Sequence, residues 1–273
     1  MEQVLDEGNG PAAAYDRIGI GYKQVRRPDP RLGAPIRQAL GGARTVVNVG
    51  AGAGSYEPED AEVTAVDPSQ VMLDQHPGPR KVKAGAEELP FADGAFDAAM
   101  AVLTVHHWPD LHRGLGELRR VSRRQAVFTW DPEHRPELWI VDEYLPEIRE
   151  LDHARFTPVA EVADALDAHT VLPFPIPYDF TDGFQTAHWR RPEAYLDPAV
   201  RAASSTFAAA LRGGAGDGTA PRRPGLRGLG AAPRPPARAG ERGLRLPPGR
   251  RRGVVTARPP APTRRRPARA GRC

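Results

Sequence analysis

Short apolar runs alternate along the first 210 residues with segments whose apolar side chains recur at helical spacing. The run at 46–49 is mostly β-branched and apolar throughout, which predicts a strand buried on both faces. Similar runs at 62–66, 98–103 and 125–130 predict further strands. The segment 111–120 places its leucines every three or four positions, as an amphipathic helix does. This alternation predicts an α/β fold with a doubly wound, mostly parallel sheet.

The rest of this region supplies weaker elements. The pattern predicts a short helix over 35–40, a brief strand at Val82, helices over 137–151 and 159–166, and a strand over 170–176 that two prolines interrupt. The total is six strands.

Glycines follow the first predicted strand at positions 50, 52 and 54, and Asp67 follows the second. Glycine lets the backbone turn sharply, so that backbone N–H groups and a helix N-terminus face whatever lies above the loop. An acid at the end of the second strand can accept both hydroxyls of a ribose. Ser55 stands where the third glycine of a dinucleotide fingerprint would be. The pattern therefore predicts a nucleoside-like ligand other than a dinucleotide.

This glycine alternation resembles the first motif of class I S-adenosylmethionine-dependent methyltransferases. Residues 82–91, Val-Lys-Ala-Gly-Ala-Glu-Glu-Leu-Pro-Phe, are similar to the adenine-side loop of small-molecule members such as the ubiquinone/menaquinone group. Residues 96–102 resemble that family's fourth strand, and residues 117–121 resemble the helix before its fifth. The resemblance covers residues 15–207. It implies a Rossmann-like sheet and in-line methyl transfer to a small-molecule acceptor.

The resemblance also implies a set of residues that bind the cofactor, S-adenosylmethionine. Two positions depart from the family pattern: Asn48 stands where many members carry an acid, and Gly85 stands where an Asp often meets the adenine. The cofactor-binding residues expected from the matched motifs are Gly50, Ala51, Gly52, Gly54, Asp67, Pro68, Ala86, Glu87 and Leu103.

Candidate catalytic and acceptor-binding residues follow the fourth and fifth strands, at the edge where such sheets bind ligands. His106 is the candidate general base, with a loop-capping histidine as the alternative. For Trp130 the alternative role is packing in the core. For the arginine pair at 190–191 the alternative role is a structural ion pair. The residues expected to contact the acceptor are Tyr22, His107, Trp108, Trp130, His188 and Arg190.

Composition excludes several classes of protein. The single cysteine, Cys273, excludes an intrachain disulfide and a cysteine-rich zinc site, and no metal is expected. No apolar run is long enough to span a bilayer, and the first residues lack a signal core, so we expect a cytoplasmic protein without a membrane partner. A small-molecule acceptor is the expected partner, and nucleic acid is disfavoured.

The chain changes character near Leu211. Residues 1–210 carry 21 basic and 32 acidic side chains, whereas residues 211–273 carry 17 arginines and two acids, with 11 prolines and 12 glycines. Such a segment buries too little apolar area to offset the entropy of ordering it, so we predict a methyltransferase domain over 1–210 and a disordered tail over 211–273.

Three origins of this tail remain open: a nucleic-acid-binding arm, a proline-rich ligand for a partner, or a segment read in a shifted frame, which translation of the other two frames would reveal. The resemblance implies a seventh strand from the C-terminal region, between the fifth and sixth. The tail offers only the short piece 254–256. We therefore predict a sheet that lacks its last strand. Alternatives to small-molecule transfer are an RNA methyltransferase that uses the basic tail, or a folding-impaired product that only binds the cofactor.

Overall fold

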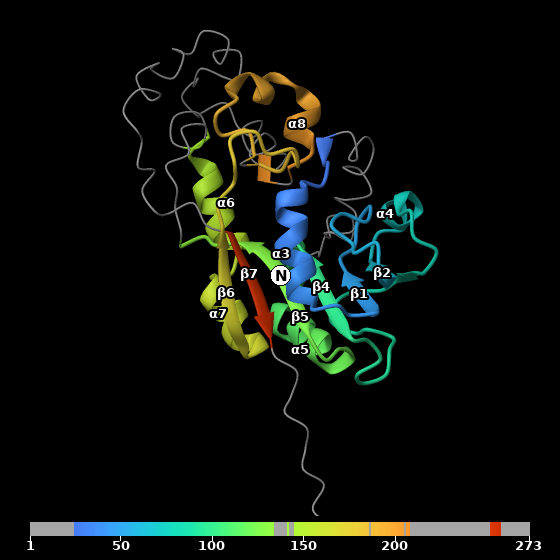
Figure 1. Ribbon diagram of the computed structural model, residues 1–273. Coiled ribbons are helices and arrows are strands. Elements are labelled where there is room, and N and C mark those ends of the chain that lie inside the picture. Colours follow the sequence, from blue (N-terminus) through green and yellow to red (C-terminus); the bar gives the residue numbers. More distant parts are fainter. Residues whose placement is uncertain are drawn as a thin grey trace, which may run out of the picture.

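The computed structural model describes residues 25–133, 141, 145–185, 187–204, 206–207 and 252–257 (Figure 1). Seven strands form one sheet in the order β3-β2-β1-β4-β5-β7-β6. The strands are β1 (Thr45–Val49), β2 (Glu62–Asp67), β3 (Lys81–Lys83), β4 (Ala98–Val102), β5 (Gln125–Trp130), β6 (Ala168–Phe174) and β7 (Arg252–Ala257).

The predicted doubly wound sheet is confirmed. β2 and β3 extend the sheet from one side of β1, and β4 and β5 extend it from the other, with all of these pairings parallel. The strand order therefore reverses between β1 and β4. In open α/β sheets, a ligand binds outside the carboxyl ends of the strands at such a point.

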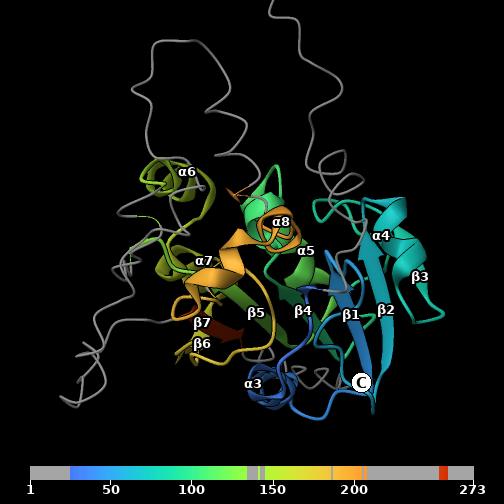
Figure 2. The same ribbon diagram turned by 90° about the horizontal axis from the view of Figure 1, so that it is seen from above.

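Helices cover both faces of the sheet (Figure 2). Leu32 and Ile36 of α3 pack with Phe128 on one face. Leu115 of α5 and Val162 of α7 pack with the opposite face. Neighbouring strand residues point to opposite faces, so β5 sends Phe128 to one cluster and Val127 to the other. The helices are α3 (Pro30–Leu40), α4 (Gln70–Gln75), α5 (Leu111–Val121), α6 (Glu147–Arg155), α7 (Val159–Leu166) and α8 (Pro198–Ala202), with 3-10 turns η1 (Val105–His107) and η3 (Pro192–Leu196).

Most differences from the predicted elements lie at their ends. α3 begins five residues before the predicted start, because the side chain of Asp29 caps it by accepting from the Arg31 N–H. The predicted helix over 137–151 lies partly outside the described residues, and α6 begins only after Pro146. A proline ring clashes with the preceding turn and therefore limits a helix to the residues after it.

The prediction that the sheet lacks its last strand is wrong. β7 pairs antiparallel with both β5 and β6 and occupies the interior position between them. The β-branched piece 254–256 is the centre of this strand. Its backbone forms hydrogen bonds with the edges of β5 and β6, which would otherwise be unpaired. This pairing stabilises the strand although the sequence around it is rich in proline and arginine. The structural description of the predicted tail is limited to these six residues.

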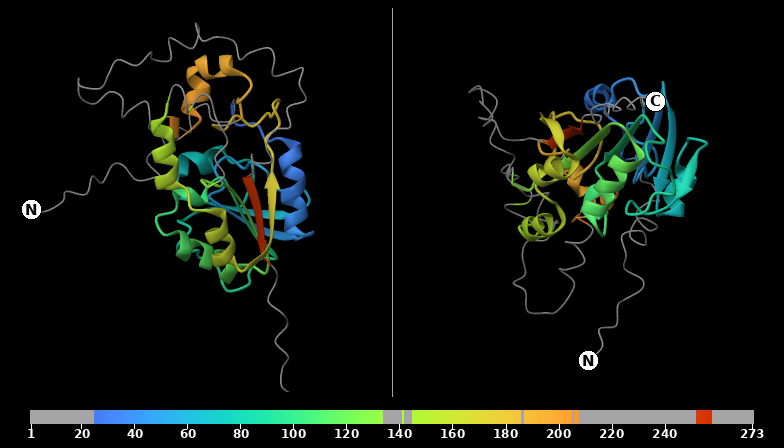
Figure 3. Two further views of the ribbon diagram at one scale, coloured as in Figure 1. Left: turned by 90° about the vertical axis from the view of Figure 1, so that its left-hand side faces the viewer. Right: turned by 90° about the horizontal axis from the view of Figure 1, so that it is seen from below.

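Residues 175–207 lie at the end of the sheet towards which the parallel strands point (Figures 1 and 3). Tyr195 and Phe207 from this segment are buried in a cluster with Leu145 and Ile148 from the region after β5. The segment thus shares an apolar cluster with the region after β5 beside the carboxyl edge of the sheet. Among the described residues, no helix is long and apolar enough to cross a membrane.

We predict that β7 is required for a stable domain. Truncation after Arg251 and truncation after Ala257 differ only by this strand. Without it, backbone groups of β5, whose six residues are all buried, lose their partners, at a cost of about 1–3 kcal/mol each. Urea denaturation should therefore give a much lower midpoint for the shorter chain. Equal midpoints would show that the domain does not depend on β7.

Candidate functional site

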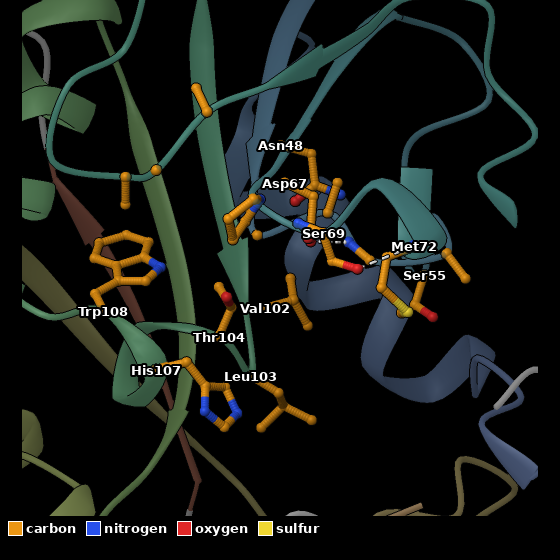
Figure 4. A pocket seen from close by; sticks show the side chains of 18 of the residues that line it. Asn48, Ser55, Asp67, Ser69, Met72, Val102, Leu103, Thr104, His107 and Trp108 are labelled. Carbon is orange, nitrogen blue, oxygen red and sulfur yellow. Dashed lines mark hydrogen bonds between the residues drawn. The ribbon is translucent and has the colours of Figure 1, made fainter. Parts of the chain in front are cut away.

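A cavity of about 220 Å³ lies at the carboxyl ends of β1, β2 and β4 (Figure 4). In this measure a single water needs about 10–15 Å³, so the cavity has room for much more than one water. Trp108 and His107 lie on one side of it, and Met72 and Ser55 lie on the other. The lining residues are Arg26, Asn48, Gly50, Ala51, Gly52, Ala53, Ser55, Tyr56, Asp67, Pro68, Ser69, Met72, Ala84, Gly85, Ala86, Glu87, Val102, Leu103, Thr104, His107, Trp108 and Pro109.

The glycine loop forms the floor of this cavity. Gly50 has φ +71°, and the N–H groups of Gly50 and Ala51 donate to the Val66 carbonyl at 2.8 and 3.0 Å. A Cβ on Gly50 would lie 1.9 Å from Oγ1 of Thr104. Glycine is therefore required here, both for the left-handed backbone and for the close approach to the loop after β4.

Asp67 joins the loops that follow the first two strands. Its side chain is largely buried, one oxygen accepting from the Gly52 N–H at 2.8 Å and the other from the Ser69 N–H at 2.9 Å. A carboxylate oxygen has two lone pairs and can accept more than one hydrogen bond, and Asp67 lines the cavity. Ser69 in turn caps α4 by accepting from the Met72 N–H.

The two predicted histidines are placed differently. His107 lines the cavity, whereas the catalytic candidate His106 does not. The ring of His106 stacks on Phe156 with centroids 4.2 Å apart and lies 3.9 Å from the ring of His107. Burial and the positive charge of Arg155 lower the pKa of His107 to about 4. At neutral pH a neutral imidazole therefore faces the cavity.

Sequence reasoning missed an ionic network at the cavity. Arg26 lines the cavity and forms a two-bond ion pair with Asp182, which is 1% exposed. The hydroxyl of Tyr56 donates to Asp182 at 2.8 Å and accepts from the Asp29 N–H at 3.3 Å. Burial and the charge of Asp182 raise the pKa of Tyr56. These residues carry no local motif, because three distant segments bring them together.

Comparison with known proteins agrees with this arrangement. Residues 47–129, from β1 to the end of β5, match the family described as "Methyltransferase domain". These residues therefore resemble a methyltransferase domain. The resemblance to S-adenosylmethionine-dependent methyltransferases, carried by the motifs of β1 to β5, is thus confirmed.

The chain is also similar to solved and curated proteins. A candidate methyltransferase from an antibiotic biosynthesis pathway of Anabaena variabilis superposes with a TM-score of 0.69 and 27% identity, covering 86% of this chain and 99% of that one. The uncharacterized methyltransferase YcgJ of Bacillus subtilis is 29% identical over 42% of this chain and 52% of its own. Malonyl-[acyl-carrier protein] O-methyltransferase of Pectobacterium atrosepticum is 30% identical over 47% and 53%. The chain spans about half the length of these curated relatives.

The cavity contains most of the predicted cofactor-binding residues. Gly54 lies outside the lining, and a Cβ there would lie 3.0 Å from Nε2 of His76. The loop after β4 adds a residue with a left-handed backbone, since Leu103 has φ +55° and donates its N–H to Phe128. Eight of the nine predicted residues line the cavity: Gly50, Ala51, Gly52, Asp67, Pro68, Ala86, Glu87 and Leu103.

The structure brings only part of the predicted acceptor set to the cavity. Trp108 lines it, and its ring lies against α5 where a Cβ on Gly114 would come within 2.4 Å. Trp130 packs in the apolar cluster of Tyr195 and Phe207. Tyr22 lies outside the described residues.

His188 and Arg190 also lie outside the cavity lining. The ring of His188 is buried edge-on against Tyr195, with centroids 5.8 Å apart. The guanidinium of Arg190 is exposed and stacks over the Trp189 ring at 5.4 Å. The described residues contain no group of three or more side chains that could hold a metal ion.

We predict that Gly50→Ala destabilises the fold more than Gly42→Ala. Both glycines have φ near +70°, but a Cβ on Gly42 meets nothing within 4 Å. The two variants therefore share the backbone strain, and only Gly50→Ala adds the overlap with Thr104, which should cost a further amount of about 1–3 kcal/mol. Urea denaturation measures the difference. Equal losses of stability in the two variants would mean that the glycine loop shifts to accommodate the added Cβ without an energetic cost.

We predict that the domain loses stability as the pH falls from 6.5 towards 4. Burial and the charge of Arg191 lower the pKa of His188 to about 4, whereas an unfolded histidine titrates near 6.5. In this window the unfolded chain binds a proton that the folded chain does not, so the free energy of unfolding falls by about 1.4 kcal/mol per pH unit for this group.

His188→Phe should make the stability less dependent on pH, whereas His169→Phe, at an exposed position, should not. Urea denaturation at pH 7 and pH 5 tests the difference. The same slope in wild type and His188→Phe would contradict the shifted titration.

Proposed function

We propose that the chain binds S-adenosylmethionine in this cavity and transfers its methyl group to a small-molecule acceptor. The observation that carries the proposal is the junction of the glycine loop and the Asp67 carboxylate at the reversal of strand order. A backbone without side chains and a carboxylate with acceptor capacity meet there, as a nucleoside with a charged amino-acid tail requires.

The chemistry of the lining fits this cofactor. Asp67 is suited to accept from the ribose hydroxyls, and Ala86 and Glu87 lie where the adenine is expected. The glycine loop leaves room for the amino-acid portion. Asn48 contributes a side-chain oxygen, Oδ1, that is buried without a hydrogen-bond partner. A ligand with a donor at this point would satisfy that oxygen, and unpaired buried acceptors are otherwise costly.

The protein's part in the reaction is chiefly to position the reactants. The cofactor supplies a methyl group on a positively charged sulfur, which is already a good leaving group. His107 and Trp108 line the side of the cavity opposite Met72 of α4 and are suited to hold the acceptor in line. Because His107 stays neutral, its ring can accept a hydrogen bond from an acceptor hydroxyl or amine and orient the attacking lone pair.

The charge of the lining favours a small acceptor over a nucleic acid. Among the described lining residues, Asp67 and Glu87 are acids, and Arg26 is the one arginine or lysine. Arg26 is already paired with Asp182. A site for a phosphate backbone would need several basic groups, so the RNA alternative gains no support from the cavity.

Relatives with named acceptors support the same class. One match is the malonyl-[acyl-carrier protein] O-methyltransferase already described, and another is the 2-methyl-6-phytyl-1,4-hydroquinone methyltransferase 2 of rice, 32% identical over 35% of this chain. Both names specify non-nucleic-acid acceptors. The apolar side of the cavity at Leu103 and Trp108 suits acceptors of limited polarity.

We predict that Asp67→Asn weakens the binding of S-adenosylhomocysteine at least tenfold, whereas Asp74→Asn does not. The amide that replaces the Asp67 carboxylate can no longer accept from both backbone N–H groups and from the ribose, and losing a hydrogen bond to a charged group costs about 1.5–3 kcal/mol. Asp74 lies on the exposed side of α4 and bonds only to Gln70 there.

Isothermal titration calorimetry of both variants gives the affinities, and turnover on a panel of hydroxyl- and amine-bearing acceptors then tests methyl transfer itself. An Asp67→Asn protein that folds and binds as tightly as wild type would refute the assignment.

A further inference from the structure

We infer that Glu57 and His76 act as positioning residues that turn the carbonyl oxygen of Asn48 towards the α-ammonium group of the bound cofactor. The inference rests on the proposed function and adds the residues that select this end of the ligand. Neither Glu57 nor His76 lines the cavity; both act through Asn48.

The chain of contacts begins at His76, which follows α4 and is 3% exposed. Its Nδ1 accepts from the Gly78 N–H at 3.0 Å, so the ring proton must be on Nε2. Nε2 lies 2.9 Å from Oε1 of Glu57 and donates to it. The backbone at Gly78 thus selects the tautomer that holds the glutamate.

Glu57 then determines the orientation of the Asn48 amide. A carboxylate oxygen only accepts hydrogen bonds, and Nδ2 of Asn48 donates to the same Oε1 at 2.8 Å. Rotating the amide by 180° would place its oxygen against the carboxylate and lose this bond. Oδ1 therefore stays on the other side, where it is buried and has no hydrogen-bond partner.

The position and charge of this oxygen indicate the group it receives. Asn48 lines the cavity two residues before Gly50, next to the loop that faces the amino-acid portion of the ligand. The Glu57 carboxylate lies directly behind the amide and polarises it. An acceptor with a negative charge behind it favours a cationic donor over a neutral one. The amino-acid portion of the cofactor has one such donor, its α-ammonium group.

The test compares two ligands on matched variants. S-adenosylhomocysteine carries the ammonium group, and its deaminated analogue differs only by lacking it. Calorimetry gives the ratio of the two dissociation constants for wild type, Asn48→Leu, Asn48→Ala, Glu57→Gln and Glu59→Gln. Glu59 lies on the same loop but is exposed, so Glu59→Gln is the matched control. The alanine variant keeps the test available if the leucine variant does not fold.

Wild type and Glu59→Gln should prefer S-adenosylhomocysteine by about tenfold or more, as expected for a hydrogen bond to a charged group. Both Asn48 variants should lose this preference while keeping their affinity for the analogue. Glu57→Gln should reduce it, because the glutamine oxygen can still accept from Asn48 and His76 but carries no charge to polarise the Asn48 amide.

A wild-type protein that binds both ligands equally would overturn the inference and leave the proposed function intact. So would variants that lose affinity for both ligands by the same factor, since that is the signature of a structural role. A folded wild-type protein that binds neither ligand would overturn the proposed function together with the inference.

Discussion

The two hydrogen bonds that the Asp67 carboxylate accepts hold the cavity together. One comes from the glycine loop after β1 and the other from the turn that begins α4. Ala51 of the first loop also packs with Ala65 and with Leu73 of α4, so apolar contacts and these hydrogen bonds act together. A charged acceptor makes stronger bonds to backbone N–H groups than a neutral one does. The residue expected to touch the ribose is thus also the one that shapes its site.

The carboxylate of Asp182 likewise joins separate segments of the chain. Asp182 comes from the segment after β6, and Arg26 and Tyr56 reach it from the chain before α3 and from the end of the glycine loop. Tyr56 has φ +66°, an unfavourable backbone for a residue with a Cβ. Its hydroxyl bonds to Asp182 and to the Asp29 N–H offset this strain. The glycine loop is therefore anchored at both ends by acids from elsewhere in the chain.

The sequence predicts those features that depend on local chemistry. β5 and α7 match their predicted ranges because each is a compact apolar pattern bounded by polar residues. Gly50 and Asp67 are recognisable because a left-handed turn and a strand-end acid both leave a local signature. β7 escaped prediction because its three β-branched residues lie among prolines and arginines. What stabilises it is the pairing with two strands far away in sequence.

The choice between His106 and His107 shows a different limit of prediction from sequence. Both lie in the single 3-10 turn η1, where successive side chains point about 120° apart because the turn has three residues. Spacing alone cannot say which of them faces the cavity. Phe156, from the end of α6, stacks on the ring of His106, so the cavity receives His107. Arg26 and Asp182 could not be paired from sequence for the same reason, since their contact exists only after three segments have packed.

These contacts share one physical consequence. Three charged groups at or near the cavity already have partners: Asp67 has two backbone N–H groups, Arg26 has Asp182, and Glu57 has Asn48 and His76. Their positions are therefore set before a ligand arrives, and binding need not reorganise them. Dipoles that are fixed in advance stabilise charge more effectively than dipoles that must turn. A positively charged sulfur bound beside them would experience a field determined by the fold rather than by solvent.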